Sequence, residues 1–241
     1  NNDQLLYYFY KSKNENERSE YVKLLIKETE MYKPHLVNKK INTIYIGGGT
    51  PSLLAPNDIS LLFSYLKNQD IAEVNNIPEV AIEVAPDTVE YEKFTEFKSI
   101  GINRVNLGFQ ASNLSELQSI GRKHGVSTLS NSFEVIKKVG FKNVCIDLIY
   151  GLQNQTFDSW SNSVEFVINY SPETICIYPL TLRPNTAYSQ KGYSVIDSEI
   201  QSKKYDFALN ALTKAGYKQE NHVRFVKKNG GYLQKEYHWK M

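Results

Sequence analysis

The sequence predicts an α/β fold in which a parallel β-sheet forms an open sheet or a partial barrel. Short apolar runs typical of strands alternate along the chain with amphipathic helical patterns, and this alternation is typical of repeated strand–helix units. Six strand patterns occur, which is too few for a closed eight-unit barrel. A sheet that does not close is therefore the expected architecture.

The strands and helices are expected in a regular order. Strands are predicted at residues 5–7, 41–46, 80–84, 104–109, 144–149 and 174–178. Helices are predicted at residues 19–32, 57–66, 88–99, 114–120, 129–139 and 197–214, with a further one beginning after Thr156. The second helix shows the basis of these assignments, because its apolar residues recur at the spacing of one helical face: Ile59, Leu62, Phe63 and Leu66.

The alternation of strands and helices is lost toward the C-terminus. We expect residues 1–190 to form the partial barrel and residues 191–241 to begin a C-terminal α+β extension. Residues 230–236 resemble the segment that precedes a further glycine-rich stretch in a known family, yet the chain stops at Met241, so we expect this extension to be incomplete.

The composition restricts the class of protein. The chain has 241 residues, of which 41% are hydrophobic and 22% are charged, and these values are ordinary for a globular protein. Its formal net charge is +2 and no basic block stands out, so no nucleic-acid partner is expected. The longest apolar runs are shorter than a membrane span, and residues 1–4 do not resemble a signal peptide. We therefore expect a cytoplasmic protein with no membrane partner.

Only two cysteines occur in the sequence, Cys145 and Cys176. Each lies in an apolar run that is predicted to be a buried strand, so both are expected to be inert thiols packed in the core. Two cysteines 31 residues apart, with no ligand residues beside them, make a poor metal site. The sequence therefore assigns no metal ligand, and it assigns no catalytic residue.

Candidate binding residues follow the predicted strands, because ligands of parallel α/β folds bind at the C-terminal ends of the strands. Gly47, Gly48 and Gly49 follow the strand at 41–46 and lead into Thr50. Three glycines permit positive φ and a close approach of a ligand to the backbone, although a tight turn without a ligand is the alternative. Neither the P-loop pattern nor the dinucleotide-binding G-x-G-x-x-G pattern is present.

Four further candidates are polar side chains near later strand ends. Glu83 and Asp147 lie in apolar strands, and Asp147 is expected to be buried; a carboxylate there is costly unless it is paired or binds a ligand. Gln110 either lines the site or caps the helix that follows it. Arg122 suits bidentate binding of a carboxylate or a phosphate, although most surface arginines have no such role.

The segments around these residues occur in one order along the chain: Gly-Gly-Gly-Thr-Pro, Ile-Glu-x-x-Pro, Arg-Val-x-Leu-Gly-x-Gln, Gly-Arg-x-His and Ile-Asp-Leu-Ile-Tyr-Gly-Leu. This ordered set closely resembles the oxygen-independent coproporphyrinogen III oxidase-like family of radical S-adenosylmethionine (SAM) proteins. The similarity is continuous over about residues 8–186. It implies a partial (β/α)6 barrel, similar to an incomplete TIM barrel, with a SAM site at the strand ends.

The resemblance also implies roles for the candidate residues. The glycine turn would meet the methionyl end of SAM, Glu83 would reach its ribose or other polar groups, and Arg122 would pair with its carboxylate. Gln110 and Asp147 would line the same cavity or contact a second SAM, and the exit of the last strand would frame the adenine. The expected SAM-binding residues are Gly47, Gly48, Gly49, Thr50, Glu83, Gln110, Arg122, Asp147, Tyr178 and Leu180.

The activity that the resemblance implies is radical chemistry. In this family a [4Fe–4S] cluster, reduced by a donor such as flavodoxin or ferredoxin, cleaves SAM to a 5′-deoxyadenosyl radical. The radical abstracts hydrogen from a small organic substrate, as in porphyrinogen oxidative decarboxylation, radical C-methylation or cyclopropanation. The sequence leaves open the substrate, the number of SAM molecules and the oligomeric state. Residues that could face a substrate are Arg183, Arg224, Tyr232 and Gln234, for which surface roles are the alternative.

Two other functions are open within the same family. Some of its members are haem chaperones, and the Gly-Arg-x-His segment fits that subgroup equally well; the candidate haem ligands are then His35, His124, His222 and His238. A catalytically silent homologue that lacks the cluster is the second alternative.

The cluster ligands are the one part of the family pattern that this sequence lacks. The family carries Cys-x3-Cys-x2-Cys after its first strand, and no cysteine precedes Cys145 here. Residues 5–7 resemble the start of that strand and residues 8–12 resemble the segment after the third cysteine, yet the two adjoin directly. Our hypothesis is that a cysteine-bearing loop is missing from the sequence between Tyr7 and Tyr8.

Overall fold

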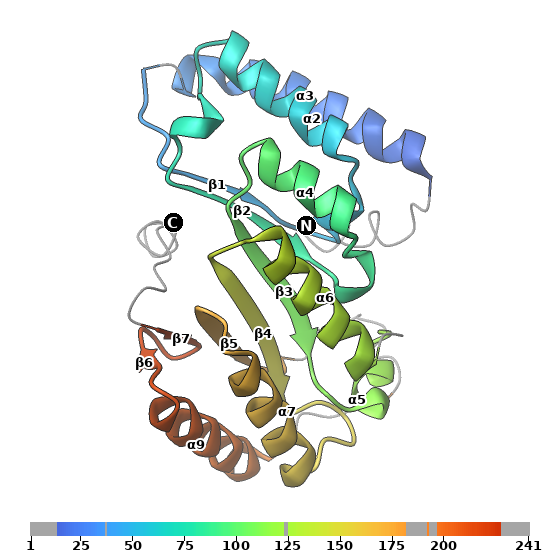
Figure 1. Cartoon of the computed structure of the whole chain (residues 1–241), viewed down its shortest axis with the longest axis vertical. Coiled ribbons are helices and arrows are strands. Elements are labelled where there is room, and N and C mark those ends of the chain that lie inside the picture. The colour runs from blue at the N-terminus through green and yellow to red at the C-terminus, as the bar shows by residue number, and fades with distance from the viewer. Residues whose placement is uncertain (1–13, 37, 123–124, 182–191, 193–196, 228–241) are drawn as a thin grey trace. The chain divides into compact units, whose positions relative to one another are not determined.

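The computed structural model describes residues 14–36, 38–122, 125–181, 192 and 197–227 (Figure 1). These residues form two compact units. The first unit holds residues 14–105 and 135–142, and the second holds residues 106–134 and 143–227, in each case as far as they are described. The predicted strand at 5–7 and the junction between Tyr7 and Tyr8 lie outside the described residues.

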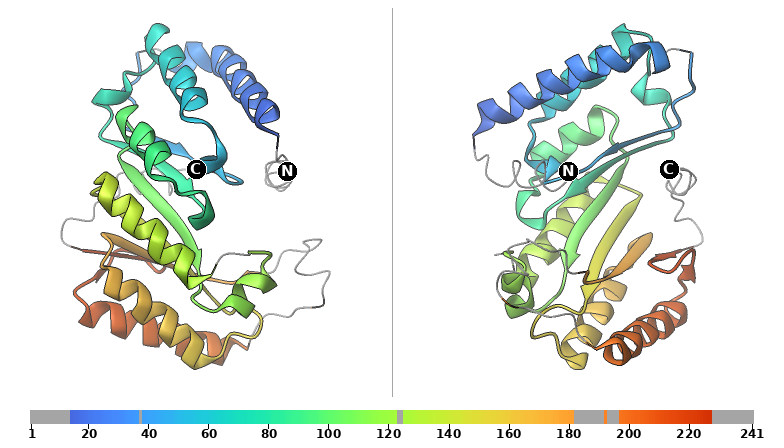
Figure 2. Two further views of the ribbon diagram at one scale, coloured as in Figure 1. Left: turned by 45° about the vertical axis from the view of Figure 1, so that its right-hand side comes forward. Right: turned by 180° about the vertical axis from the view of Figure 1, so that it is seen from behind.

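The first unit contains two parallel strands and the helices that follow them. Its elements are α2 (Glu15–Leu36), β1 (Thr43–Ile46), α3 (Pro56–Asn68), β2 (Glu79–Val84), α4 (Tyr91–Ser99) and three short 3-10 helices at Pro51–Leu53, Val74–Asn76 and Pro86–Thr88. β1 and β2 pair in parallel from Thr43 opposite Glu79 to Ile46 opposite Ile82. α2 and α3 lie side by side in every view (Figure 2).

The second unit continues the same pattern and then departs from it. Its elements are β3 (Arg104–Gln110), α5 (Leu114–Ser119), α6 (Val126–Val139), β4 (Val144–Tyr150), α7 (Phe157–Tyr170), β5 (Thr174–Pro179), α9 (Ser198–Lys214), β6 (Lys218–Gln219) and β7 (Arg224–Val226), with the first residues of β3 and the end of α6 in the first unit. β4 and β5 are parallel, from Cys145 opposite Thr174 to Tyr150 opposite Pro179. β7 lies antiparallel to β5.

The predicted fold class is confirmed. The strand order is β1-β2-β3-β4-β5-β7-β6, so the first five described strands follow one another as in a parallel βα array. The order is linear, with β1 and β6 at the two edges of the described sheet. This arrangement is that of a sheet that does not close, and it is compatible with a partial barrel.

The alternation of side chains along β4 and β5 separates a helix-covered face from an opposite face. Tyr150 points to the helical side, where its ring lies 5.6 Å from the ring of the fully buried Trp160 on α7. α7 and α9 lie side by side there (Figure 2). The Trp160 indole donates a hydrogen bond to the Lys204 carbonyl at 2.8 Å. Side chains an odd number of residues from Tyr150 on β4, such as that of Asp147, therefore project from the opposite face of the strand.

Three features differ from the sequence prediction. α2 extends several residues beyond 19–32 at both ends and contains Pro34 in its last turn. The helix predicted at 88–99 begins as a 3-10 turn and becomes α-helical only at Tyr91. The two- and three-residue strands β6 and β7 were not predicted, because strands so short carry no alternating pattern. None of the described helices is long and apolar enough to cross a membrane.

Candidate functional site

The glycine turn after β1 needs glycine at each of its three positions. Gly48 and Gly49 have φ of +88° and +64°, a region that other residues adopt only with strain. At Gly47 the requirement is space, since a Cβ atom would lie 2.5 Å from a ring carbon of Tyr45 and 3.0 Å from a carboxylate oxygen of Glu83. Gly47 and Gly48 are exposed. The turn therefore presents bare backbone at the end of the strand, as the SAM prediction requires.

Glu83 holds this turn in place. One of its carboxylate oxygens accepts a hydrogen bond from the Tyr45 hydroxyl at 2.7 Å, and the other accepts one from the Gly48 N–H at 2.9 Å. The carboxylate in an apolar strand is thus paired, as its desolvation cost demands. Tyr45 was not predicted from the sequence, because an aromatic residue in a strand is ordinary.

Thr50 ends the turn and begins a short helix. Its carbonyl accepts a hydrogen bond from the Leu53 N–H at 3.0 Å, which starts the 3-10 helix. Within that helix the Ser52 hydroxyl lies 2.6 Å from the Thr88 hydroxyl and accepts a hydrogen bond from the Ala85 N–H at 3.3 Å. These contacts tie the segments that follow β1 and β2 to each other, so the glycine turn is anchored on both sides.

In the second unit Gln110 ends β3 in a strained conformation. Its φ of +74° lies in the left-handed region, and such a conformation costs about 1–3 kcal/mol in a residue other than glycine. Strain of this kind concentrates at ligand-binding positions. The alternative role of helix cap is wrong, because Asn113 caps α5 by accepting hydrogen bonds from the N–H groups of Ser115 and Glu116.

Arg122 follows the end of α5. Its backbone N–H donates to the Leu117 carbonyl at 2.9 Å, and its side chain is partly exposed. His124 of the same segment lies outside the described residues, as do Arg183, Tyr232, Gln234 and His238. The carboxylate-binding role of Arg122 stays a prediction.

Asp147 lies beside the sulfur atoms of Cys145 and Cys176. It is half-buried, and not fully buried as expected. The Cys145 thiol donates to its carboxylate at 3.6 Å, and the Cys145 and Cys176 sulfur atoms are also 3.6 Å apart. Both thiols are buried as expected. Their contact with each other and with a carboxylate could not be predicted, because it depends on how β4 and β5 pair.

Two acid groups on this face have shifted pKa values. The hydrogen bond from Cys145 and the positive charge of Arg224 lower the pKa of the Cys176 thiol to about 6, although burial acts in the opposite direction. Burial and the negative charges of Asp147 and Cys176 raise the pKa of Tyr178 well above its usual value. The surroundings therefore make the Cys176 thiol more acidic than usual, while the Tyr178 phenol keeps its proton at neutral pH.

Leu180 connects the ends of β4 and β5. Its N–H donates to the Tyr150 carbonyl at 2.8 Å. Its side chain packs against the small buried cluster of Ala111, Leu117 and Leu152. The backbone predicted to frame the adenine is therefore fixed at the same edge as Gln110, which directly precedes Ala111 in the sequence.

A buried polar network that the sequence did not predict supports this edge. The Lys204 ammonium donates to the backbone carbonyl of Gln155 at 2.7 Å and to its side-chain oxygen at 3.1 Å. The Gln155 amide donates to the Ile149 carbonyl at 3.0 Å and to Glu116 at 3.1 Å, and its oxygen accepts the Gly151 N–H at 2.7 Å. Lys204 and Glu116 are almost fully buried. Only Glu116 could have indicated this network from the sequence, because it is a carboxylate in the apolar face of a short helix.

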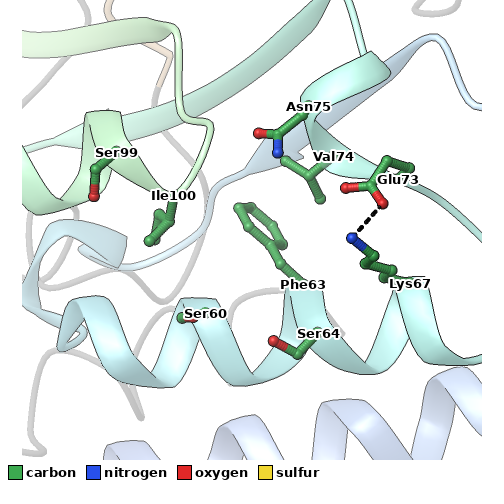
Figure 3. A pocket seen from close by; sticks show the side chains of 9 residues that line it. All are labelled: Ser60, Phe63, Ser64, Lys67, Glu73, Val74, Asn75, Ser99 and Ile100. Atoms are coloured by element: carbon green, nitrogen blue, oxygen red, sulfur yellow. Dashed lines mark ion pairs between the residues drawn. The ribbon is translucent and has the colours of Figure 1, made fainter.

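A pocket of about 160 Å³ lies elsewhere in the first unit, between α3, α4 and the 3-10 helix that precedes β2 (Figure 3). Figure 3 shows the Phe63 ring at its centre and the Lys67–Glu73 ion pair, at 2.8 Å, at one side. Its residues precede the N-terminal ends of β2 and β3. Within the first unit, the pocket therefore lies at the opposite end of β2 from Glu83.

Comparison with known proteins identifies the family. The family model of the radical SAM superfamily matches residues 8–167, which is more than half of the chain. The chain belongs to the radical SAM superfamily. The resemblance drawn from the strand-end segments is thereby confirmed.

Curated relatives refine the position within the radical SAM superfamily. Heme chaperone HemW of Buchnera aphidicola subsp. Acyrthosiphon pisum is 34% identical over 220 residues, which are 88% of this chain and 56% of that protein. Heme chaperone HemW of Haemophilus influenzae is 33% identical over 200 residues, 83% of this chain and 52% of that protein. This radical SAM chain therefore spans about half the length of the curated relatives it matches.

A solved structure of the superfamily has the same fold. Coproporphyrinogen III oxidase (HemN) from Escherichia coli, a radical SAM enzyme, superimposes with a TM-score of 0.81, covering 90% of this chain and 50% of that one. The sequence identity is 22%, so this similarity establishes the radical SAM fold and not the reaction.

Proposed function

We propose that this chain is the radical SAM part of a haem-binding protein that acts as a haem chaperone. The relatives called heme chaperone HemW carry this proposal, since they cover 88% and 83% of the chain at 34% and 33% identity. The structural similarity to an oxidase rests on a lower identity of 22%. The haem-chaperone alternative is therefore preferred over the enzyme that the sequence first suggested.

SAM is the cofactor that the superfamily implies, and the residues of the first unit fit it. In this superfamily SAM supplies a 5′-deoxyadenosyl radical. The turn at residues 47–50 offers unshielded backbone groups at a strand end, where parallel α/β folds bind ligands. Glu83 and Tyr45 set the conformation of that turn through the hydrogen bonds described above. We expect the turn to bind the methionyl end of SAM and Glu83 to orient it.

The residues of this chain do not fit the superfamily's [4Fe–4S] cluster. Such a cluster is held by thiolates, and the two cysteines of the chain lie on neighbouring strands beside Asp147 rather than in one Cys-x3-Cys-x2-Cys loop. Cys145 and Cys176 cannot supply the three thiolates that the superfamily uses. No step of the function is therefore assigned to a cluster on these residues.

The missing cysteines are expected at the junction between Tyr7 and Tyr8. Sequencing the gene across these two codons should show an inserted segment that encodes Cys-x3-Cys-x2-Cys. The family match begins at residue 8, on the C-terminal side of the junction, which supports this expectation. Uninterrupted codons for Tyr7 and Tyr8 would contradict it and would favour the catalytically silent homologue.

Two of the four histidines lie among the described residues, and both are exposed candidates for a haem ligand. His35 lies in the last turn of α2. The His222 ring stacks on the Tyr205 ring at 4.4 Å, and the Tyr205 hydroxyl donates to the His222 carbonyl at 2.9 Å. Histidine is a common axial ligand of haem iron. His222 is the better supported candidate, because the stacking fixes its ring beside an aromatic surface.

Titration of the full-length protein with haem, followed by the Soret absorbance, tests the proposal. We expect a saturable shift at one haem per chain in the wild type, weakened at least tenfold in His222→Ala and little changed in His35→Ala. A wild type that shows no saturable shift would contradict haem binding. If both variants bind as the wild type does, the haem is held elsewhere, and His222 is excluded as its ligand.

The second candidate function is SAM cleavage coupled to a reaction of a small organic substrate, and the glycine turn with Glu83 favours it. Anaerobic iron–sulfur reconstitution of the full-length protein, followed by a reductant and SAM, separates the two functions. 5′-Deoxyadenosine above background would support the enzyme. A haem complex with no such product would support the chaperone.

A further inference from the structure

Three side chains of ligand type converge on one face of the sheet in the second unit. Cys145, Asp147 and Cys176 place one ligand atom each within 4.8 Å of the others. The Cys145 sulfur is 3.6 Å from the Cys176 sulfur and 3.6 Å from a carboxylate oxygen of Asp147. Among the described residues no other group of three such side chains meets this criterion.

The backbone of two paired strands produces this convergence. Cys145 and Asp147 are two residues apart on β4, so they project from the same face. Asp147 lies opposite Cys176 in the parallel pairing of β4 with β5, which places Cys176 on that face of the neighbouring strand. The three ligand atoms are therefore held by a rigid sheet, and their separation does not depend on a loop.

Two of the three separations match those of a tetrahedral metal site, and the third, between Cys176 and Asp147, is within 4.8 Å. Zinc binds thiolates at about 2.3 Å and carboxylate oxygens at about 2.0–2.2 Å. At tetrahedral angles these bond lengths place two sulfur ligands about 3.8 Å apart and a sulfur and an oxygen about 3.5–3.7 Å apart. The observed separations are both 3.6 Å. We propose that Cys145, Asp147 and Cys176 form a binding site for Zn²⁺.

The surroundings of these three side chains suit a metal ion that keeps one coordination position free for a fourth ligand. Asp147 is half-buried and Tyr178, two residues beyond Cys176 on the same face, is 38% exposed, so an ion can enter beside them. A water molecule or the Tyr178 hydroxyl completes the fourth corner. Arg224 lies opposite Cys176 on β7 and pairs with Glu220 at 3.3 Å. Its charge offsets the excess negative charge of two thiolates and a carboxylate around a divalent ion.

A disulfide between the two cysteines explains the convergence of the three side chains less completely than a zinc site does. It would require the sulfur atoms to approach from 3.6 Å to about 2.0 Å, and it would not involve the carboxylate of Asp147 beside them. Zinc uses all three groups, with the two separations from the Cys145 sulfur already close to those of a tetrahedral site. The mixed sulfur and oxygen ligands also suit zinc, which accepts both.

Binding of Co²⁺ as a spectroscopic substitute for Zn²⁺ tests the site in the 241-residue chain, kept reduced. Cys145 and Cys176 are the only cysteines of this chain, so a thiolate-to-cobalt charge-transfer band reports on them alone. We expect one Co²⁺ per chain with tetrahedral d–d bands, displaced by an equivalent of Zn²⁺. The variants Cys145→Ser and Cys176→Ser should lose the charge-transfer intensity and bind Zn²⁺ at least a hundredfold more weakly.

The matched control is Asp158→Asn, which removes an exposed carboxylate in the first turn of α7, and it should bind as the wild type does. Asp147→Asn should retain the charge-transfer band but bind more weakly. X-ray absorption of the Zn²⁺-loaded wild type should show two sulfur neighbours, and this measurement requires no variant to fold. A reduced wild type without saturable Co²⁺ binding, or a band unchanged in both serine variants, would overturn the proposal.

Discussion

Replacing Lys204 by methionine is expected to lower the free energy of unfolding by about 3–5 kcal/mol, the usual cost of removing one member of a buried charged group. The Lys204 ammonium donates two hydrogen bonds to Gln155 and is 1% exposed. Without it, the buried carboxylate of Glu116 loses the positive charge of Lys204. Urea unfolding followed by circular dichroism measures the loss.

The neighbouring Lys203 provides the control. Its side chain is 66% exposed and pairs with Glu199 at 2.7 Å on the surface of α9. Exposed ion pairs of this kind contribute about 0.3–0.5 kcal/mol, so Lys203→Met should change stability little. Equal effects of the two substitutions would contradict the structural role of the network.

The Lys204 network should also make stability depend on pH. Burial lowers the pKa of Lys204 in the folded protein, although the charge of Glu116 acts in the opposite direction. The unfolded chain therefore binds more protons between the folded pKa and the ordinary value of about 10.4, and stability rises with pH across that window. The contribution of Lys204 falls as pH decreases through the folded pKa. Lys204→Met should abolish this part of the pH dependence.

Replacing Gly47 by alanine is the second change expected to have a large effect. The new Cβ would lie 2.5 Å from the Tyr45 ring and 3.0 Å from Glu83, so the turn or the Tyr45–Glu83 hydrogen bond must move. Overpacking of this kind costs about 1–3 kcal/mol. Because the turn is the expected site of the methionyl group, SAM affinity should fall at least tenfold, or about 1.4 kcal/mol. Calorimetric titration of the full-length protein with SAM measures it.

Gly48→Ala distinguishes the effect of steric conflict from the effect of backbone strain within the same turn. A Cβ at Gly48 meets no atom within 4 Å, but φ is +88° there, so the strain is confined to its own backbone. We expect a cost of about 1 kcal/mol and a smaller loss of SAM affinity than in Gly47→Ala. SAM binding by Gly47→Ala at the wild-type affinity would refute the proposed role of the turn.

Local patterns were sufficient to predict most of the fold. The spacing of apolar residues predicted the helix α3, and the glycines that follow β1 predicted a turn. Each of these assignments depended only on residues that are neighbours in the sequence. Thr156 and Asp197 also marked helix starts correctly, and each accepts a hydrogen bond from the first turn of its helix. The boundary expected near residue 190 stays a prediction.

The candidate site was predictable only in part. The positions of Glu83 and Gln110 near the ends of their strands follow from the order of strands and helices, whereas Asp147, expected near a strand end, lies in the middle of β4. The partner of Glu83 does not follow from this order, because Tyr45 lies 38 residues from it. The supporting network is equally non-local, since Lys204 lies 49 residues from Gln155. No local pattern marks a residue for a contact at such a separation.

The sequence by itself determined the α/β class, the succession of strands and helices, and the strand ends at which SAM is expected. Only the tertiary structure decided which side chains meet there. Cys145 and Cys176 illustrate the difference, since 31 residues separate them and each alone is an ordinary core thiol. Their sulfur atoms meet beside Asp147 because the pairing of β4 with β5 sets one register. A shift of one residue would turn Cys176 to the opposite face, and register is a property of the assembled sheet.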